Sequence, residues 1–273
     1  MRFKVFEALK RFGKTLMKYS YKQILNSLPK KKNSNSSWWV KLWVRRVSFL
    51  FTYLFINLGF SPNAVSVLSI FVTLAACVLF AVPAKWAVIV AIVLINLWLI
   101  LDCVDGNIAR CRKIKTAYGE FVDDIGGYYT VAFAYLAIGV CAYHTGGALF
   151  SQNNIWLIVM GGISSICDIL ARLIHKDYEH FTDKTLTSEK LLEKNSRESY
   201  EAPDKKSISY IRRRLGKELG ISGAFMPLTI VCCVFNAYDL MTVFYLLFNG
   251  AALLLSTVLF IYRANKYDKN HTG

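Results

Sequence analysis

Two aspartates stand three residues apart near the end of an apolar stretch, and their spacing is the first indication of chemistry in this sequence. Asp102 and Asp105 are followed by Gly106, Ala109 and Arg110. In a helix these five positions fall within an arc of roughly 140°. The small residues on that face let a ligand approach the backbone closely, and the guanidinium fork of the arginine suits a phosphate.

A second polar stripe follows after a short basic turn. Thr116, Gly119 and Asp123 fall on one narrow face of the next expected helix. Two helices joined by a short turn pack antiparallel, so we expect the two polar faces to oppose each other. The carboxylates of Asp102, Asp105 and Asp123 would then converge in one pocket.

Three carboxylates in a low-dielectric site repel one another unless protonation or a cation relieves the repulsion. Hard oxygen ligands without histidine or cysteine favour Mg²⁺, Mn²⁺ or Ca²⁺, and magnesium in particular completes its shell with substrate phosphates. The sequence therefore predicts a metal site at Asp102, Asp105 and Asp123 that faces a diphosphate. In the alternative reading, Asp102 and Asp105 pair with Arg110 and Arg112 and only fix the helix ends.

Composition indicates the environment of these helices. Hydrophobic residues make up 55% of the 273 residues and charged residues only 19%, yet the net charge is +15. This combination is typical of a membrane protein whose basic residues are concentrated in loops. We expect the basic residues to bind anionic lipid headgroups, and we expect no nucleic-acid partner.

Six apolar runs are candidates for membrane-spanning helices, which need about 20 residues each. They are Ala64–Val82, Trp86–Leu101, Tyr128–Tyr143, Trp156–Ile174, Ile221–Val234 and Met241–Tyr262. The second run continues to about Arg112 and the third begins near Gly119, so both helices project polar turns at one membrane face. The shorter run Val47–Phe60 predicts a helix lying at the interface. We therefore predict an all-α, integral membrane bundle of six transmembrane helices preceded by an interfacial amphipathic helix.

The remaining segments are polar or basic. Residues 1–46 contain thirteen lysines and arginines with one acid, Glu7, and predict a basic amphipathic N-terminal arm on the membrane surface. The six-helix transmembrane domain is expected at 47–265, with a cytoplasmic loop at 176–217 that ends in a surface helix, and a C-terminal tail follows at 266–273. Basic residues concentrate in the termini, the Arg110–Lys115 turn and the loop, so we expect both termini and the site at the cytoplasmic face.

The spacing D-x-x-D-G-x-x-A-R, then eight residues and G-x-x-x-D, resembles the signature of the CDP-alcohol phosphotransferase (CDP-alcohol phosphatidyltransferase) family. The Ser61-Pro62-Asn63 start of the first span and the six-helix pattern resemble it as well. The resemblance implies a transfer from a CDP-alcohol donor to an acceptor with release of CMP. It also implies a homodimer and a setting in a bacterial cytoplasmic membrane, in phospholipid or glycan-precursor synthesis.

The resemblance further implies roles for individual residues. Asp102 and Asp123 would each contact two metal ions and act in catalysis, and Asp105 would contact one metal ion. The expected donor-binding positions are Gly106, Ala109, Arg110, Thr116 and Gly119.

One position departs from the family pattern. The pattern ends in a further aspartate, expected to bind metal and deprotonate the acceptor, and Gly127 stands at that position. The general base is therefore unassigned. Asp124 lies roughly 100° around the helix from Asp123, and Asp168 could simply be neutralised by Arg172 one turn later.

Three accounts of this departure stay open. A base comes from elsewhere in the chain, or the acceptor is a phosphate that is already ionised, or the chain binds nucleotide without turnover. The acceptor itself could be a lipid, a polyol or a phosphorylated compound. The competing functional class is a non-catalytic nucleotide-binding relative or an ion-coupled carrier, although a carrier would place acids near the middle of the bilayer on several helices.

Overall fold

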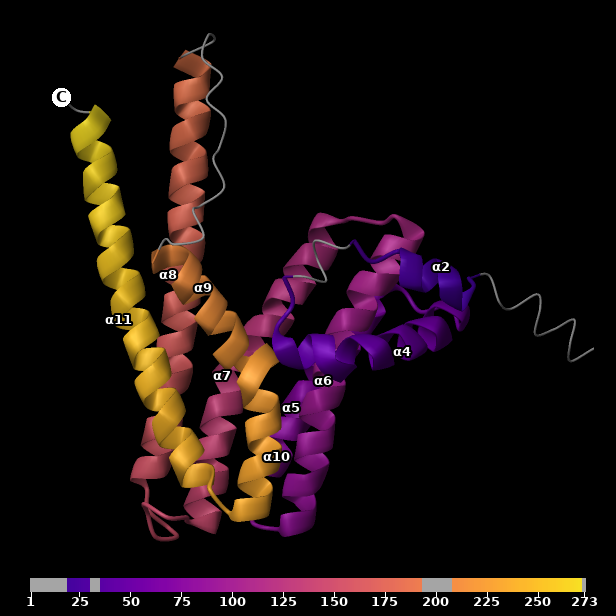
Figure 1. Ribbon diagram of the computed structural model, residues 1–273, viewed down its shortest axis with the longest axis vertical. Coiled ribbons are helices and arrows are strands. Elements are labelled where there is room, and N and C mark those ends of the chain that lie inside the picture. The colour runs from indigo at the N-terminus through magenta and orange to yellow at the C-terminus, as the bar shows by residue number, and fades with distance from the viewer. Residues whose placement is uncertain (1–18, 30–34, 193–207, 272–273) are drawn as a thin grey trace, which may run out of the picture. The chain divides into compact units, whose positions relative to one another are not determined.

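The computed structural model describes residues 19–29, 35–192 and 208–271, and throughout these ranges the regular elements are helices (Figure 1). Six of the described helical segments are long and apolar enough to cross a membrane. They are Pro62–Phe80, Lys85–Arg112, Ala117–Thr145, Trp156–Tyr178, Arg214–Phe235 and Tyr238–Asn265. The prediction of an all-α integral membrane protein with six spans is confirmed. Half of the expected N-terminal arm (residues 1–18 and 30–34) and residues 272–273 of the tail lie outside the described residues.

The chain divides into two compact units, which are described separately. The first comprises Met1–Thr130 with Lys217–Val231, and the second comprises Val131–Gly216 with Cys232–Gly273. The helices of the first unit are α2 (Tyr21–Asn26), a π-helical turn (Val40–Val44), α4 (Arg45–Asn57), α5 (Pro62–Phe80) and α6 (Lys85–Arg112). It also contains the first half of α7 (Ala117–Thr145), the end of α9 (Ile208–Leu219), a π-helical turn (Ile221–Phe225) and the start of α10 (Met226–Phe235).

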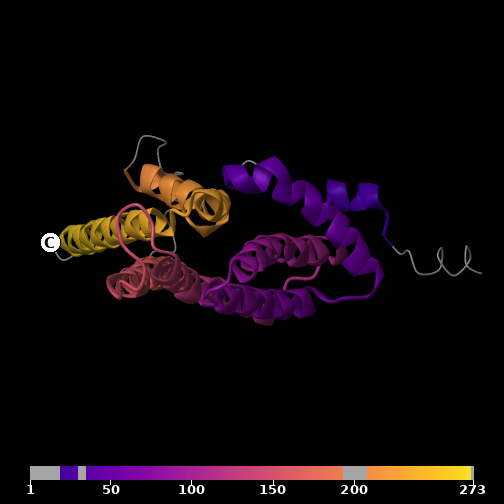
Figure 2. The same ribbon diagram turned by 90° about the horizontal axis from the view of Figure 1, so that it is seen from below.

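Helix α5 packs along α6 in the first unit, and both are visible side by side in Figures 1 and 2. Helix α4 also packs against α6 but runs crosswise to it, as expected for a helix at the interface beside helices that cross the bilayer (Figure 1). Fully buried apolar side chains of α6, including Ile95, Val104 and Ile108, fill this core. The expected helix at Val47–Phe60 is thus observed as α4, which begins two residues earlier and ends three residues earlier.

Local signals in the sequence determine where the helices of the site begin and end. The hydroxyl of Ser61 accepts a hydrogen bond from the Ala64 amide, and Pro62 occupies the first turn of α5. Helix α6 ends at Arg112, and Lys113 follows with a left-handed backbone (φ 55°). This conformation lets the Ile114 amide reach the carbonyl of Ala109, while the Lys113 amide donates to the carbonyl of Arg110. The chain then turns at once into α7.

The second unit contains the rest of α7 with α8 (Trp156–Leu192) and α11 (Tyr238–His271). Helices α7 and α8 approach closely at Gly139, where the lack of a Cβ makes room: a Cβ there would lie 2.5 Å from the Leu157 carbonyl oxygen. Helix α8 packs along α11, where His175 and Tyr178 contact the ring of Phe260.

The prediction of a loop at 176–217 is wrong for the first part of this segment. Helix α8 continues through its first part to Leu192, and α9 begins at Ile208. The charges of residues 176–192 end the membrane-spanning part of α8 but do not end the helix, because lysine and glutamate are good helix formers. The helix expected at the end of this region is present as α9.

Candidate functional site

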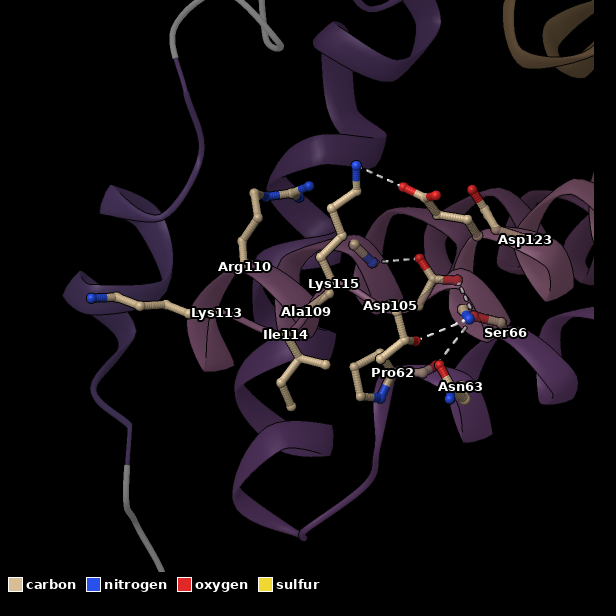
Figure 3. Close-up of a pocket in the computed structure, with 14 residues that line it drawn as sticks. Pro62, Asn63, Ser66, Asp105, Ala109, Arg110, Lys113, Ile114, Lys115 and Asp123 are labelled. Carbon is tan, nitrogen blue, oxygen red and sulfur yellow. Dashed lines mark hydrogen bonds and ion pairs between the residues drawn. The ribbon is translucent and has the colours of Figure 1, made fainter. Parts of the chain in front are cut away.

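A cavity of about 560 Å³ opens where α5, α6 and α7 meet in the first unit (Figure 3). It is lined from α5 by Pro62, Asn63 and Ser66, and from α6 by Asp105, Gly106, Ala109 and Arg110. The turn and the start of α7 contribute Lys113, Ile114, Lys115, Thr116, Gly119, Glu120 and Asp123. The two polar faces expected from the sequence therefore border one space. Asp102 is not among the lining residues.

Asp105 is the most enclosed carboxylate of the cavity, at 7% exposure. Its Oδ2 accepts a hydrogen bond of 2.6 Å from the Ser66 hydroxyl, and its Oδ1 accepts one from the Gly106 amide (Figure 3). Asp102 and Asp123 are both close enough to interact with it electrostatically. The three aspartates thus lie in one electrostatic neighbourhood, with two of them at the cavity wall.

The donor atoms of this wall fit a hard divalent cation by their chemistry. Asp105 and Asp123 contribute carboxylate oxygens, and Ser66 and Asn63 add neutral oxygens. Among the residues that the structure describes, no three acidic, histidine or cysteine side chains are grouped closely enough to hold a metal ion by themselves. The fit therefore rests on the type of donor, and further oxygens would have to come from a ligand such as a phosphate.

Arg110 forms the basic side of the cavity. Its Nη2 donates to Oδ1 of Asn107 over 2.5 Å, and its Nε is buried without a hydrogen-bond partner among the residues that the structure describes. A Cβ at Gly106 would lie 3.2 Å from Nη1 of this arginine. The guanidinium therefore folds over the glycine, within electrostatic reach of the Asp105 carboxylate.

The start of α7 is held close to the start of α5. The Thr116 hydroxyl accepts a hydrogen bond of 3.1 Å from the Gly119 amide, as a helix cap does. A Cβ at Gly119 would lie 3.0 Å from that hydroxyl and 3.1 Å from Oδ1 of Asn63. The glycine thus allows the side chain of Asn63 to reach α7 at the cavity wall.

The turn between α6 and α7 adds positive charge at the rim. Lys113 and Lys115 line the cavity with Arg110, and Lys115 forms an ion pair of 2.9 Å with Glu120. The hydrogen bond to Glu120 raises the pKa of Lys115. Three basic side chains thus stand on this side of the cavity, which suits an anionic ligand.

The residues considered as alternative bases are not among those that line the cavity. Asp124 is exposed and does not line the cavity. Asp168 belongs to the second unit, where Arg172 Nε donates to its Oδ1 over 3.0 Å and the Tyr135 hydroxyl donates to its Oδ2 over 3.3 Å. At Gly127, a Cβ would have no atom within 4 Å, so the missing side chain of the family pattern leaves open space.

Sequence reasoning did not assign a role in the site to Asn63, Ser66 or Asn107. The helix-start pattern Ser61-Pro62-Asn63 was a usable signal for the first of these, since it places an amide at the beginning of α5. Ser66 follows one turn later on the same helix. Asn107 lies in a gap of the spaced motif, and nothing in the sequence distinguishes it.

Residues 60–190 match the model of the family described as CDP-alcohol phosphatidyltransferase. This segment contains α5, α6, α7 and most of α8, and it includes every residue that lines the cavity. The family recognised from the spaced aspartates is confirmed by this match. No curated protein matches the chain.

Proposed function

The chain belongs to the CDP-alcohol phosphatidyltransferase family through residues 60–190, and we propose that it is a membrane transferase that moves a phosphate-linked alcohol from a CDP-alcohol donor to an acceptor. An acceptor oxygen attacks the phosphorus that carries the alcohol. The bond from this phosphorus to the bridging oxygen breaks, and that oxygen leaves with CMP.

The observation that supports this proposal is the composition of the cavity wall. Carboxylates of Asp105 and Asp123 border the same space as Arg110, Lys113 and Lys115. A cavity with both charge signs is unsuited to an apolar ligand, but it matches a metal-bound diphosphate, whose cations face the carboxylates and whose remaining oxygens face the bases.

The donor-binding roles follow from chemistry and position. Arg110 would bind a phosphate oxygen through the donors that do not reach Asn107. Gly106, Ala109 and Gly119 would let the donor approach the helix backbones, and Thr116 would hold the first turn of α7 at the cavity.

We propose that Asp102, Asp105 and Asp123 hold Mg²⁺ or Mn²⁺, in a site of one or two ions. When bound, such cations neutralise charge on the diphosphate and on departing CMP. The chain's own contribution is to orient the ligands, and the Ser66 hydroxyl fixes the carboxylate of Asp105 for this purpose.

The setting of the reaction is part of the same proposal. The basic loops support a site at the cytoplasmic face with both termini on that side. We propose a homodimer that acts in phospholipid or glycan-precursor synthesis, with a lipid, polyol or phosphorylated acceptor.

A CMP-release assay on the purified full chain in lipid nanodiscs tests the proposal. The donors are CDP-diacylglycerol and CDP-linked polar alcohols, each with lipid, polyol and phosphorylated acceptors, in Mg²⁺, Mn²⁺ or EDTA. We expect CMP from at least one pair, lost in EDTA. If CDP binds but no pair gives metal-dependent CMP, the chain is a non-catalytic nucleotide-binding relative; if CDP does not bind either, the donor assignment is wrong.

A further inference from the structure

The side-chain amide of Asn107 bridges α4 to the arginine of the cavity. Asn107 is fully buried, and its Nδ2 donates to Oγ1 of Thr52 over 3.0 Å and to Oγ of Ser48 over 3.4 Å. On the other side, its Oδ1 accepts from Nη2 of Arg110 over 2.5 Å. One amide therefore connects the crosswise helix to a residue of the cavity wall.

The orientation of this amide is determined by the two hydroxyl groups. Thr52 Oγ1 donates to the Ser48 carbonyl over 2.6 Å, and Ser48 Oγ donates to the Arg45 carbonyl over 2.9 Å. Because each hydroxyl has one proton and that proton is used within α4, both oxygens face Asn107 as acceptors. The NH₂ end of the amide must then face α4, and the carbonyl end must face Arg110.

The orientation of the Asn107 amide matters for Arg110 because a second arginine, Arg45, lies nearby. Arg45 on α4 is 7% exposed, and its Nη2 donates to Ser36 Oγ over 2.8 Å. Arg45 and Arg110 repel each other electrostatically. The Arg110 guanidinium is therefore repelled by a like charge on α4, and the hydrogen bond to the Asn107 carbonyl counters this repulsion.

We propose that Asn107 is a positioning residue, which holds the guanidinium of Arg110 at the cavity wall and ties it to the interfacial helix α4. The nature of the ligand that Arg110 then binds, the diphosphate of a CDP-alcohol, rests on the proposed function. The positioning itself does not, since it depends only on contacts within the chain.

Asn107→Leu is the direct test, and Asn96→Leu is its matched control. Asn96 is also buried in α6, where its Oδ1 accepts from Trp39 Nε1 over 3.2 Å and its Nδ2 donates to the Ile92 carbonyl. Both variants lose a buried amide of the same helix, but only one of these amides touches Arg110.

Three quantities are measured on the full chain: the thermal midpoint, the dissociation constant for CDP with Mg²⁺, and the rate at which phenylglyoxal labels Arg110, followed by peptide mass spectrometry. We expect both variants to melt earlier by similar amounts. Asn107→Leu should weaken CDP binding about tenfold, as loss of a charge-assisted hydrogen bond does, and should speed labelling about threefold. Asn96→Leu should change neither quantity.

Equal labelling of Arg110 in the two variants would overturn the inference, whatever the activity of the protein. If the wild-type chain binds no CDP, the proposed function fails and the labelling rate alone decides the inference. In an Arg110→Met background, Asn107→Leu should weaken CDP binding no further; the same loss in both backgrounds would mean that the amide acts through general stability.

A second variant covers the case in which Asn107→Leu does not fold. Ser48→Ala combined with Thr52→Val keeps Asn107 but removes the two acceptors that orient it. The amide can then turn its NH₂ end toward Arg110, so we expect faster labelling of Arg110 here too. A wild-type labelling rate in this variant would contradict the inference.

Discussion

The hydroxyl of Ser66 on α5 donates a 2.6 Å hydrogen bond to Oδ2 of Asp105 on α6, and both side chains are buried. The bond joins the first membrane-spanning helix to the second at the wall of the cavity. It leaves the carboxylate in one orientation relative to Asp123, which lines the same cavity from α7. Helix α5 therefore takes part in the site although it contributes no charged group.

Ser66→Ala should lower the apparent affinity for Mg²⁺ and the kcat/KM for the donor. A hydrogen bond to a charged group contributes about 1.5–3 kcal/mol, so we expect a loss of about tenfold or more in kcat/KM. The measurement is CMP release as a function of Mg²⁺ concentration. Ser69→Ala is the matched control, because Ser69 is buried in the same helix but donates to the Ser66 carbonyl within α5. Equal effects of the two substitutions would contradict a specific role for Ser66.

Asp105→Asn and Asp123→Asn should each abolish metal-dependent CMP release, to below about one thousandth of the wild-type rate. An amide keeps the shape of the carboxylate but removes the charge that a cation requires. Rates are measured in Mg²⁺ and Mn²⁺ alongside Asp177→Asn, which changes an exposed carboxylate of α8. If either cavity variant kept a metal-dependent rate near that of Asp177→Asn, the metal assignment would be wrong.

The fold was largely predictable because spans depend on length and hydropathy, which the sequence carries directly. It was harder to predict which turn of a helix borders the cavity. Asp102 shares the helix face of Asp105, but it lies one turn away, about 4.5 Å along the axis. The cavity includes Asp105 and not Asp102, and angular spacing alone cannot distinguish these two positions.

The neutral residues of the site were not predictable for a different reason. Ser66 and Asn107 act through hydrogen bonds to partners 39 and 55 residues away in the sequence. Such pairs form only when helices pack, and a single serine or asparagine in an apolar helix has many structural uses. The charged motif could be recognised because its members lie close together in the sequence. Placing carboxylates in a membrane-spanning helix costs free energy, so their presence there indicates a function.

Gly127→Asp should fold like the wild type and raise the rate of CMP release with hydroxyl acceptors. A Cβ at this position meets no atom within 4 Å, so the substitution has space. The new carboxylate would lie one turn after Asp123 on the same face of α7 and could accept the acceptor's proton.

Gly127→Ala is the control for this prediction. It adds helix propensity and bulk without a base, and it should raise the thermal midpoint slightly while leaving the rate unchanged. A fall in rate in both variants would show instead that a substrate uses the space at Gly127. An unchanged rate in Gly127→Asp would mean that acceptor deprotonation does not limit turnover.

Asp168→Asn should destabilise the second unit without removing activity. Arg172 donates to both oxygens of Asp168, at 3.0 and 3.4 Å, and the Tyr135 hydroxyl donates to one of them. A carboxylate held by these donors is suited to joining α7 to α8 rather than to moving a proton of the acceptor. We expect an earlier thermal midpoint, by the equivalent of about 1–3 kcal/mol, with CMP release within about threefold of wild type.

Arg172→Met should lower the midpoint as well, and the double variant should lose less than the sum of the two because they share one interaction. A rate loss of about a hundredfold in Asp168→Asn with an unchanged midpoint would instead assign this carboxylate to the chemistry.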